Sequence, residues 1–148
     1  MHHKEVIEKI ILELKLLSGD LGVKREEIKY ADFPFTGAPP IGVIVSPLEE
    51  TEGNSTNETS DIGYQVQITR VYHKLSGRDA DAGLGRRSNW RQTVFNRFNR
   101  VRLGFPGFCE TMTRARFGNY EGKEAFDNIN IDSSIVIVTV WIRQPHQG

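Results

Sequence analysis

Histidine and cysteine are the side chains of this sequence best suited to catalysis or metal binding, and the sequence does not group them. The histidines are His2, His3, His73 and His146, and Cys109 is the only cysteine. An adjacent histidine pair binds divalent metals weakly, and both disulfides and cysteine-based zinc sites need more than one cysteine. We expect His73, which ends a predicted strand, to be a surface or hydrogen-bonded side chain.

Two other patterns with catalytic or phosphate-binding potential are incomplete. Gly83 and Gly85 precede a predicted helix, but the GxxxxGK[ST] pattern of a P-loop is absent. Serine, histidine and aspartate form no recognisable motif of a nucleophilic triad. We therefore predict a protein that is not an enzyme and has no catalytic residue, no metal ligand and no cofactor.

The strongest pattern is RRSNWRQTVFNRFNRVRL, residues 86–103, which we predict to be a helix. Trp90, Val94, Phe98 and Val101 recur at spacings of four, four and three residues, which is typical of one buried stripe. The remaining surface of this helix is rich in arginine, and no acidic residue interrupts it. Its arginines are Arg86, Arg87, Arg91, Arg97, Arg100 and Arg102.

Two interpretations of this arginine-rich helix lead to different functions. Arginine makes bidentate contacts with phosphate oxygens, and interleaved aromatic side chains can stack on bases. A small nucleic-acid-binding domain that uses residues 86–103 is therefore one hypothesis. In the other, the aromatic side chains lie in the core and the arginines pair with acidic residues, either of the same chain or of a neighbouring copy.

Charge is unevenly distributed along the chain, although the net charge is zero. Residues 1–62 carry twelve acidic and six basic side chains, whereas residues 63–148 carry seven acidic and thirteen basic ones. Oppositely charged halves can pack together within one chain or meet head to tail between copies. For the second case, the subunit-interface candidates are the six arginines together with Glu49, Glu50 and Glu52.

Hydrophobic periodicity predicts an α+β fold in a single domain, residues 1–148, with the order α-β-β-α-β-β. We expect about four mostly antiparallel strands with two helices packed on one face of the sheet. The predicted helices are residues 5–17 and 86–103, and the predicted strands are residues 41–45, 62–73, 110–117 and 133–143. Polar composition predicts long loops at residues 46–61 and 74–85. The longest apolar run, residues 135–138, is far too short to cross a bilayer, so we expect no membrane partner.

Local signals predict where the helices begin and end. Gly19 is placed to cap the first helix, Ser88 is the candidate N-cap of the second, and the GFPG segment at residues 104–107 supplies its stop. Phe33 and Phe35 flank a proline in DFPFTGAPP, and we expect them to attach this loop to the surface.

The order of these elements resembles the tail-terminator and neck proteins of tailed bacteriophages. Three segments carry the resemblance, which spans most of the chain. They are an apolar first helix followed by DFPFTGAPP, the DIGYQVQITRVYHK strand leading through a polar loop to RRSNWRQTVFNRFNRVRL, and the run from Gly107 through CETMTRARF to SSIVIVTVWIR.

The resemblance implies a structural virion protein without an active site. Proteins of this type assemble as rings, commonly hexamers, that cap the finished tail tube and provide the surface that joins the head. The implied partners are other copies of the chain, the tail tube protein and the neck or connector proteins. The resemblance also implies that DNA passes through the lumen without sequence-specific binding. The expected location is the tail or neck of the virion, after assembly in the host cytoplasm.

Overall fold

The fold consists of three helices and five strands in the part of the chain that the computed structural model describes. The described residues are 2–32, 41–56, 58–73, 80–118 and 131–145. The helices are α1 (His3–Leu16), α2 (Ser18–Leu21) and α3 (Ala80–Phe98), with a 3₁₀ turn at Arg25–Glu27. The strands are β1 (Ile28–Tyr30), β2 (Gly42–Ser55), β3 (Thr59–His73), β4 (Cys109–Phe117) and β5 (Ile131–Pro145).

The strands form one mixed sheet in the order β1-β2-β3-β5-β4. β1 pairs in parallel with the first part of β2, and the other neighbours pair antiparallel. The α+β class agrees with the prediction, but the expected four mostly antiparallel strands and two helices are corrected to a mixed five-stranded sheet and three helices among the described residues. β1 was missed because three residues are too few to show an alternating pattern.

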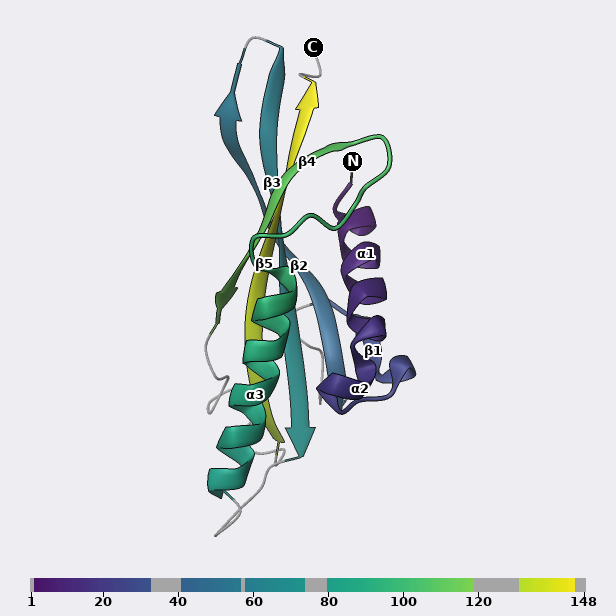
Figure 1. Ribbon diagram of the computed structural model, residues 1–148, viewed down its shortest axis with the longest axis vertical. Helices are drawn as coiled ribbons and strands as arrows, with labels where there is room; N and C mark the ends of the chain where they lie inside the picture. The colour runs from purple at the N-terminus through teal and green to yellow at the C-terminus, as the bar shows by residue number, and fades with distance from the viewer. Residues whose placement is uncertain (1, 33–40, 57, 74–79, 119–130, 146–148) are drawn as a thin grey trace.

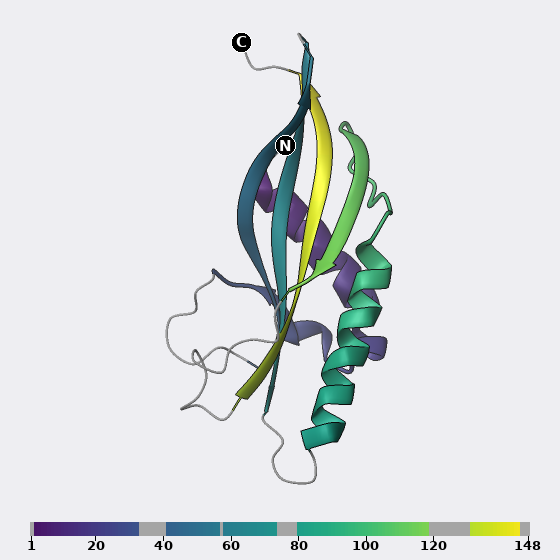
Figure 2. The same cartoon turned by 90° about the vertical axis from the view of Figure 1, so that its left-hand side faces the viewer.

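Helices α1 and α3 cover the same face of the sheet, and the hydrophobic core lies between them and the strands (Figure 2). α1 contributes Val6, Ile10 and Leu14, which recur every four residues and are fully buried. From α3, Val94 and Phe98 are also fully buried. The strands add mostly valine and isoleucine, whose branched side chains suit a pleated surface.

The helices begin and end at residues other than those that the local signals predict. α3 starts at Ala80, so Ser88 lies within the helix and is not its N-cap. Gly19 lies within α2 and does not end α1. The left-handed C-cap of α2 is Gly22, with a φ of 68°, a conformation in which glycine has no steric cost.

The end of α3 is also earlier than predicted, because the following residues join the edge of the sheet. α3 ends at Phe98, and Arg100 then adopts a left-handed φ of 58°. This turn directs Val101 into an antiparallel bridge with Thr113 of β4. The GFPG segment at residues 104–107 therefore lies beyond the helix end and does not determine it.

The predicted loop at residues 46–61 is a β-hairpin, which corrects the expectation from composition. β2 and β3 remain paired through this segment, and the hairpin extends beyond the helices at the top of Figure 1. Trp141 of β5 packs on Gly53 and Gly63, where an added Cβ would lie 2.7 and 2.9 Å from indole carbons. Aromatic cover of strand glycines stabilises a hairpin that has few apolar side chains of its own.

The second predicted loop, residues 74–85, is corrected in its last part, because α3 already begins at Ala80. Residues 74–79 lie outside the described residues. The same holds for Phe33 and Phe35, for His146 and for the side chain of His73.

β3 is buried on both faces, whereas its alternation predicts a half-buried strand. Tyr64, Val66 and Ile68 belong to the core beneath the helices. On the other face, Gln67 and Thr69 are 6% and 1% exposed. Gln67 Nε2 donates a hydrogen bond to Thr69 Oγ1 at 3.2 Å, which satisfies part of this buried polar pair.

Candidate subunit interface

Side chains are described for four of the six candidate arginines, and two of these four are engaged within their own chain. Arg91 is the more deeply buried of the two. It is 7% exposed, and its Nη2 donates a hydrogen bond to the carbonyl oxygen of Gly118. Its guanidinium carbon lies 5.1 Å from the centroid of the Phe117 ring, a favourable cation–π geometry. Arg91 therefore joins α3 to the end of β4 within its own chain.

Arg97 is the second engaged arginine, and it joins α3 to α1. Its Nη2 donates a hydrogen bond to Oε2 of Glu13, whose other oxygen lies 3.6 Å from Lys9 Nζ. The Glu13 side chain is 11% exposed, so a largely buried carboxylate contacts two cations. Within one chain, Arg97 thus pairs with Glu13, and pairing of Arg97 or Arg100 with an acid of a neighbouring copy stays a prediction.

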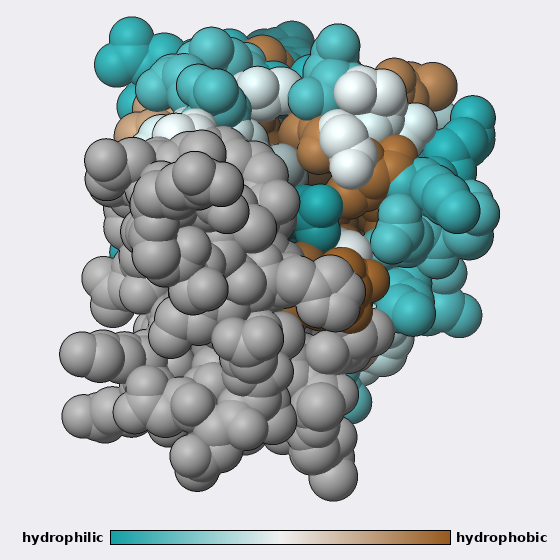
Figure 3. Space-filling view, turned by 90° about the horizontal axis from the view of Figure 1, so that it is seen from below, coloured by the Kyte–Doolittle hydropathy of each residue, from teal (hydrophilic) through white to brown (hydrophobic). Residues whose placement is uncertain are grey.

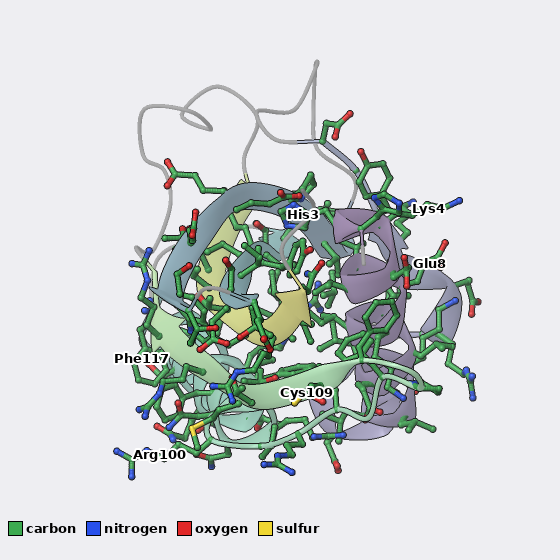
Figure 4. All side chains as sticks on the ribbon, turned by 90° about the horizontal axis from the view of Figure 1, so that it is seen from above. His3, Lys4, Glu8, Arg100, Cys109 and Phe117 are labelled. Atoms are coloured by element: carbon green, nitrogen blue, oxygen red, sulfur yellow. The ribbon has the colours of Figure 1, made fainter. Side chains whose placement is uncertain are left out.

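Arg100 and Arg102 follow α3 and are both exposed. Figure 4 shows Arg100 at the periphery of the molecule. A left-handed φ costs a non-glycine residue about 1 kcal/mol or more, so the position of Arg100 is imposed by its surroundings. The side chains of Arg86 and Arg87 lie outside the described part of the chain.

A buried carboxylate fixes the segment that carries these two arginines. Glu110 is 8% exposed and accepts hydrogen bonds from the backbone N–H groups of Leu103 at 2.7 Å and Gly104 at 2.9 Å. The hydroxyl of Thr113 donates a third, at 3.1 Å. Hydrogen bonds to an ionised acceptor are the strong ones, so Glu110 attaches the segment firmly to β4.

β4 is one outer edge of the sheet, and it carries two further exposed arginines, Arg114 and Arg116. We call Arg100, Arg102, Arg114 and Arg116 the basic edge. None of the four forms an ion pair with an acidic side chain of the described residues. Arg114 and Arg116 are not among the candidates from the sequence, although their spacing of two residues places them on one face of a strand.

The outward backbone groups of β4 are partly occupied by the segment after α3. Thr113 donates its N–H to the carbonyl of Val101 at 2.8 Å, and its carbonyl accepts the N–H of Arg100 at 2.7 Å. Ala115 donates its N–H to the side-chain oxygen of Asn99 at 3.1 Å. A partner at this level therefore meets side chains and not an open strand edge.

The opposite edge of the sheet is acidic. β1 pairs with β2 only as far as Val45, and Glu49, Glu50 and Glu52 follow on β2 as exposed residues. We call these three glutamates the acidic edge. Glu50 Oε1 lies 3.6 Å from Nδ1 of His3, which is the side chain considered above for metal binding.

The two edges lie at the same level of the sheet. Tyr64 pairs with Glu50 on one side and with Val140 on the other, and Val140 pairs with Thr113. Because Arg100 donates its N–H to Thr113, Glu50 and Arg100 end one row of residues that crosses the sheet. In Figure 4, His3 beside the acidic edge and Arg100 of the basic edge lie on opposite sides of the molecule.

Among the described residues, the other features that could indicate a function are weaker than the two charged edges. No group of three or more histidine, cysteine, aspartate or glutamate side chains among them could hold a metal ion. No helix in the described part of the chain is both long and apolar enough to cross a membrane. Cys109 is exposed and is not in a disulfide. Seen from below, the described surface is mostly hydrophilic, with apolar residues showing in a hollow (Figure 3).

No protein-family model matches this chain, and no curated protein is significantly similar to it. The two charged edges of the sheet are therefore the features on which a functional interpretation depends.

Proposed function

We propose that this chain is the subunit of a homo-oligomeric ring, of six copies, that terminates the tail tube of a phage and joins it to the neck. The observation that carries the proposal is the placement of Glu50 and Arg100 at opposite ends of one row across the sheet. One surface patch is thereby complementary to a different patch of the same molecule, which is the requirement for a head-to-tail contact.

Charge favours this head-to-tail contact over a twofold dimer. In a twofold dimer built on either edge, like charges would face each other, which costs free energy. In a ring, each acidic edge meets the basic edge of the next copy. The contact uses side chains and not shared sheet hydrogen bonds, because the outward backbone groups at Thr113 and Ala115 are already bonded within the chain.

The role at the head–tail junction rests on the resemblance in the order of elements, and one structural feature supports it. The β2–β3 hairpin extends beyond the layer of helices (Figure 1). In a ring whose axis runs along the strands, six such hairpins would project from one rim. Their tips, beyond the glutamates of the acidic edge, would offer the tail tube or the neck a contact surface.

Oligomer mass and tail length test the two parts of the proposal separately. For the ring, native mass spectrometry and light scattering at 50 mM salt are expected to show a closed oligomer whose self-association weakens as the salt concentration rises, because exposed ion pairs are screened. Monomer at every concentration, together with no ring on tail tubes in electron micrographs, would contradict the proposal.

For the terminator role, deletion of the gene from the phage that encodes it is expected to give tails of irregular length that are not joined to heads. Normal tails joined to heads would contradict this role while leaving the ring intact.

A further inference from the structure

An apolar groove lies beside the acidic edge, on the side of the sheet that carries the helices. Its volume is about 460 Å³, and His3, Lys4, Ile7, Glu8, Ile11, Tyr30 and Pro47 line it. Tyr30 is 51% exposed, and its hydroxyl donates a hydrogen bond to Asp32. Lys4 and Glu8 form an ion pair at 3.8 Å on the exposed face of α1. The groove is large enough for more than one side chain of a partner.

An exposed aromatic side chain, Phe117, lies on β4 at the opposite edge of the sheet. Phe117 is 45% exposed, although its ring stacks on Phe95 with the centroids 4.7 Å apart and an angle of 20° between the planes. The guanidinium of Arg91 lies over the same ring. Phe117 is therefore fixed in orientation before any partner binds, which lowers the entropy cost of using it as an anchor.

Tyr30 and Phe117 end the same row of residues. The row runs from Tyr30 through Val45, Ile68 and Val136 to Phe117 and crosses all five strands. It is parallel to the row that ends at Glu50 and Arg100. The sheet thus has an apolar groove and a charge at one edge, and an aromatic side chain and the opposite charge at the other.

We propose that Phe117 of each copy inserts into the groove between α1, β1 and β2 of the next copy in the ring. This inference rests on the proposed function and names the apolar anchor of its subunit contact. Copies in a closed ring are related by rotation without translation along the axis, so edges at the same level meet when the strands run along that axis. The same register then places Arg100 against Glu50 and Phe117 against Tyr30.

Insertion of Phe117 supplies binding free energy that the charged edges do not. Exposed ion pairs contribute little to affinity, whereas a buried aromatic side chain in a pocket dominates the binding free energy of a typical interface. The charges determine which edge faces which, and Phe117 provides most of the affinity. The groove edge carries acids and the Phe117 edge carries arginines, so a second copy complements the groove in both apolar character and charge.

Site-specific photocrosslinking tests this contact in the full chain. A benzophenone amino acid in place of Phe117 keeps an aromatic ring there, and its crosslinks are mapped by mass spectrometry in a mixture of isotope-labelled and unlabelled copies. Crosslinks between labelled and unlabelled chains are expected from position 117 to Tyr30, Pro47 or α1. The matched control is the same probe at Phe108, which is 38% exposed and precedes β4, and it is expected not to reach the groove.

The outcomes separate the two proposals. Rings whose crosslinks from position 117 lie elsewhere would overturn the groove contact and leave the ring intact. A chain that stays monomeric at every concentration and forms no ring on tail tubes would overturn both.

A double-mutant cycle gives a second readout. Phe117→Ala is expected to weaken self-association by roughly 30-fold, as for a typical aromatic anchor. Tyr30→Ala is expected to weaken it less, and the double variant should be little weaker than Phe117→Ala alone, because the two side chains contact each other across the interface. Phe108→Ala serves as the control with unchanged association. Strictly additive effects of Phe117→Ala and Tyr30→Ala would contradict the contact.

Discussion

The acidic edge and the basic edge end the same sheet, but different interactions fix their positions. At the acidic edge, the β2–β3 ladder and the packing of Trp141 on Gly53 and Gly63 stabilise a hairpin of polar residues. At the basic edge, the buried carboxylate of Glu110 binds the backbone of the segment after α3. The exposed glutamates of the acidic edge add contacts of their own, from Glu50 to His3 at 3.6 Å and from the Ser60 hydroxyl to Glu52 at 3.4 Å.

At each edge, the groups that hold the backbone in place are different from the charged side chains that would contact a partner. A protein that used its arginines and glutamates mainly for its own fold would pair them internally, as Arg97 and Glu13 do. At the two edges, groups other than the charged side chains fix the backbone, and the charged side chains are exposed. Each edge can therefore be disrupted in two ways, by removing the group that fixes it or by reversing its charge.

The largest expected effect is on the basic edge. Glu110→Ala leaves the buried N–H groups of Leu103 and Gly104 without their acceptor, and we expect a loss of about 3 kcal/mol in the free energy of unfolding. Urea denaturation measures this loss, and amide exchange at residues 101–104 should accelerate. The control is Glu58→Ala, an exposed carboxylate of the hairpin, with a change within about 0.5 kcal/mol. An equal loss in both variants would contradict the role of Glu110.

The corresponding change at the acidic edge is smaller. Gly63→Ala forces a methyl group to within 2.9 Å of the Trp141 indole, and we expect a destabilisation of about 1–3 kcal/mol with faster exchange in the hairpin. Gly85→Ala is the matched control, because its Cβ would meet nothing within 4 Å and alanine favours a helix. If both variants are equally stable, Trp141 does not support the hairpin.

The internal ion pair should affect the fold and not the assembly. Arg97→Ala removes a partly exposed cation from Glu13, so we expect a loss of about 1 kcal/mol in unfolding free energy. The ring measured by light scattering should be unchanged. Loss of the ring with unchanged stability would show instead that Arg97 lies at the subunit contact.

The smallest effect on stability, and one of opposite sign, is expected at Arg100. Arg100→Gly relieves the left-handed backbone, so the unfolding free energy should rise by about 0.5–1 kcal/mol. Self-association should weaken, because a charge of the basic edge is lost. A ring at least as stable as that of the natural chain would contradict the interface role of Arg100.

The long periodic segments could be predicted from the sequence, because hydrophobic spacing reflects which face is buried. The spacing of Val94 and Phe98 identifies the buried face of α3, and both are fully buried. The helix ends were wrong because they depend on tertiary pairing, as at Val101. The hairpin was missed because it is polar, and the aromatic side chain that packs on it, Trp141, is far away in the sequence.

The candidate site could be predicted from the sequence only in part. Exposed Glu50 and Arg100 were among the candidates, since charge is visible in a sequence. The internal roles of Arg91 and Arg97 were not, because a surface helix and a helix packed on two elements have the same arginine spacing. The groove at Tyr30 required the parallel pairing of β1, which three residues cannot reveal.

Mixing two charge-reversed variants tests the central claim most directly. One variant carries Glu49→Lys, Glu50→Lys and Glu52→Lys, and the other carries Arg100→Glu, Arg102→Glu, Arg114→Glu and Arg116→Glu. Each variant alone would place like charges at every contact, and we expect it to remain monomeric. In an equal mixture every contact is again complementary, so native mass spectrometry should show rings with alternating subunits. Rings from either variant alone, or none from the mixture while the natural chain forms them, would contradict the head-to-tail contact.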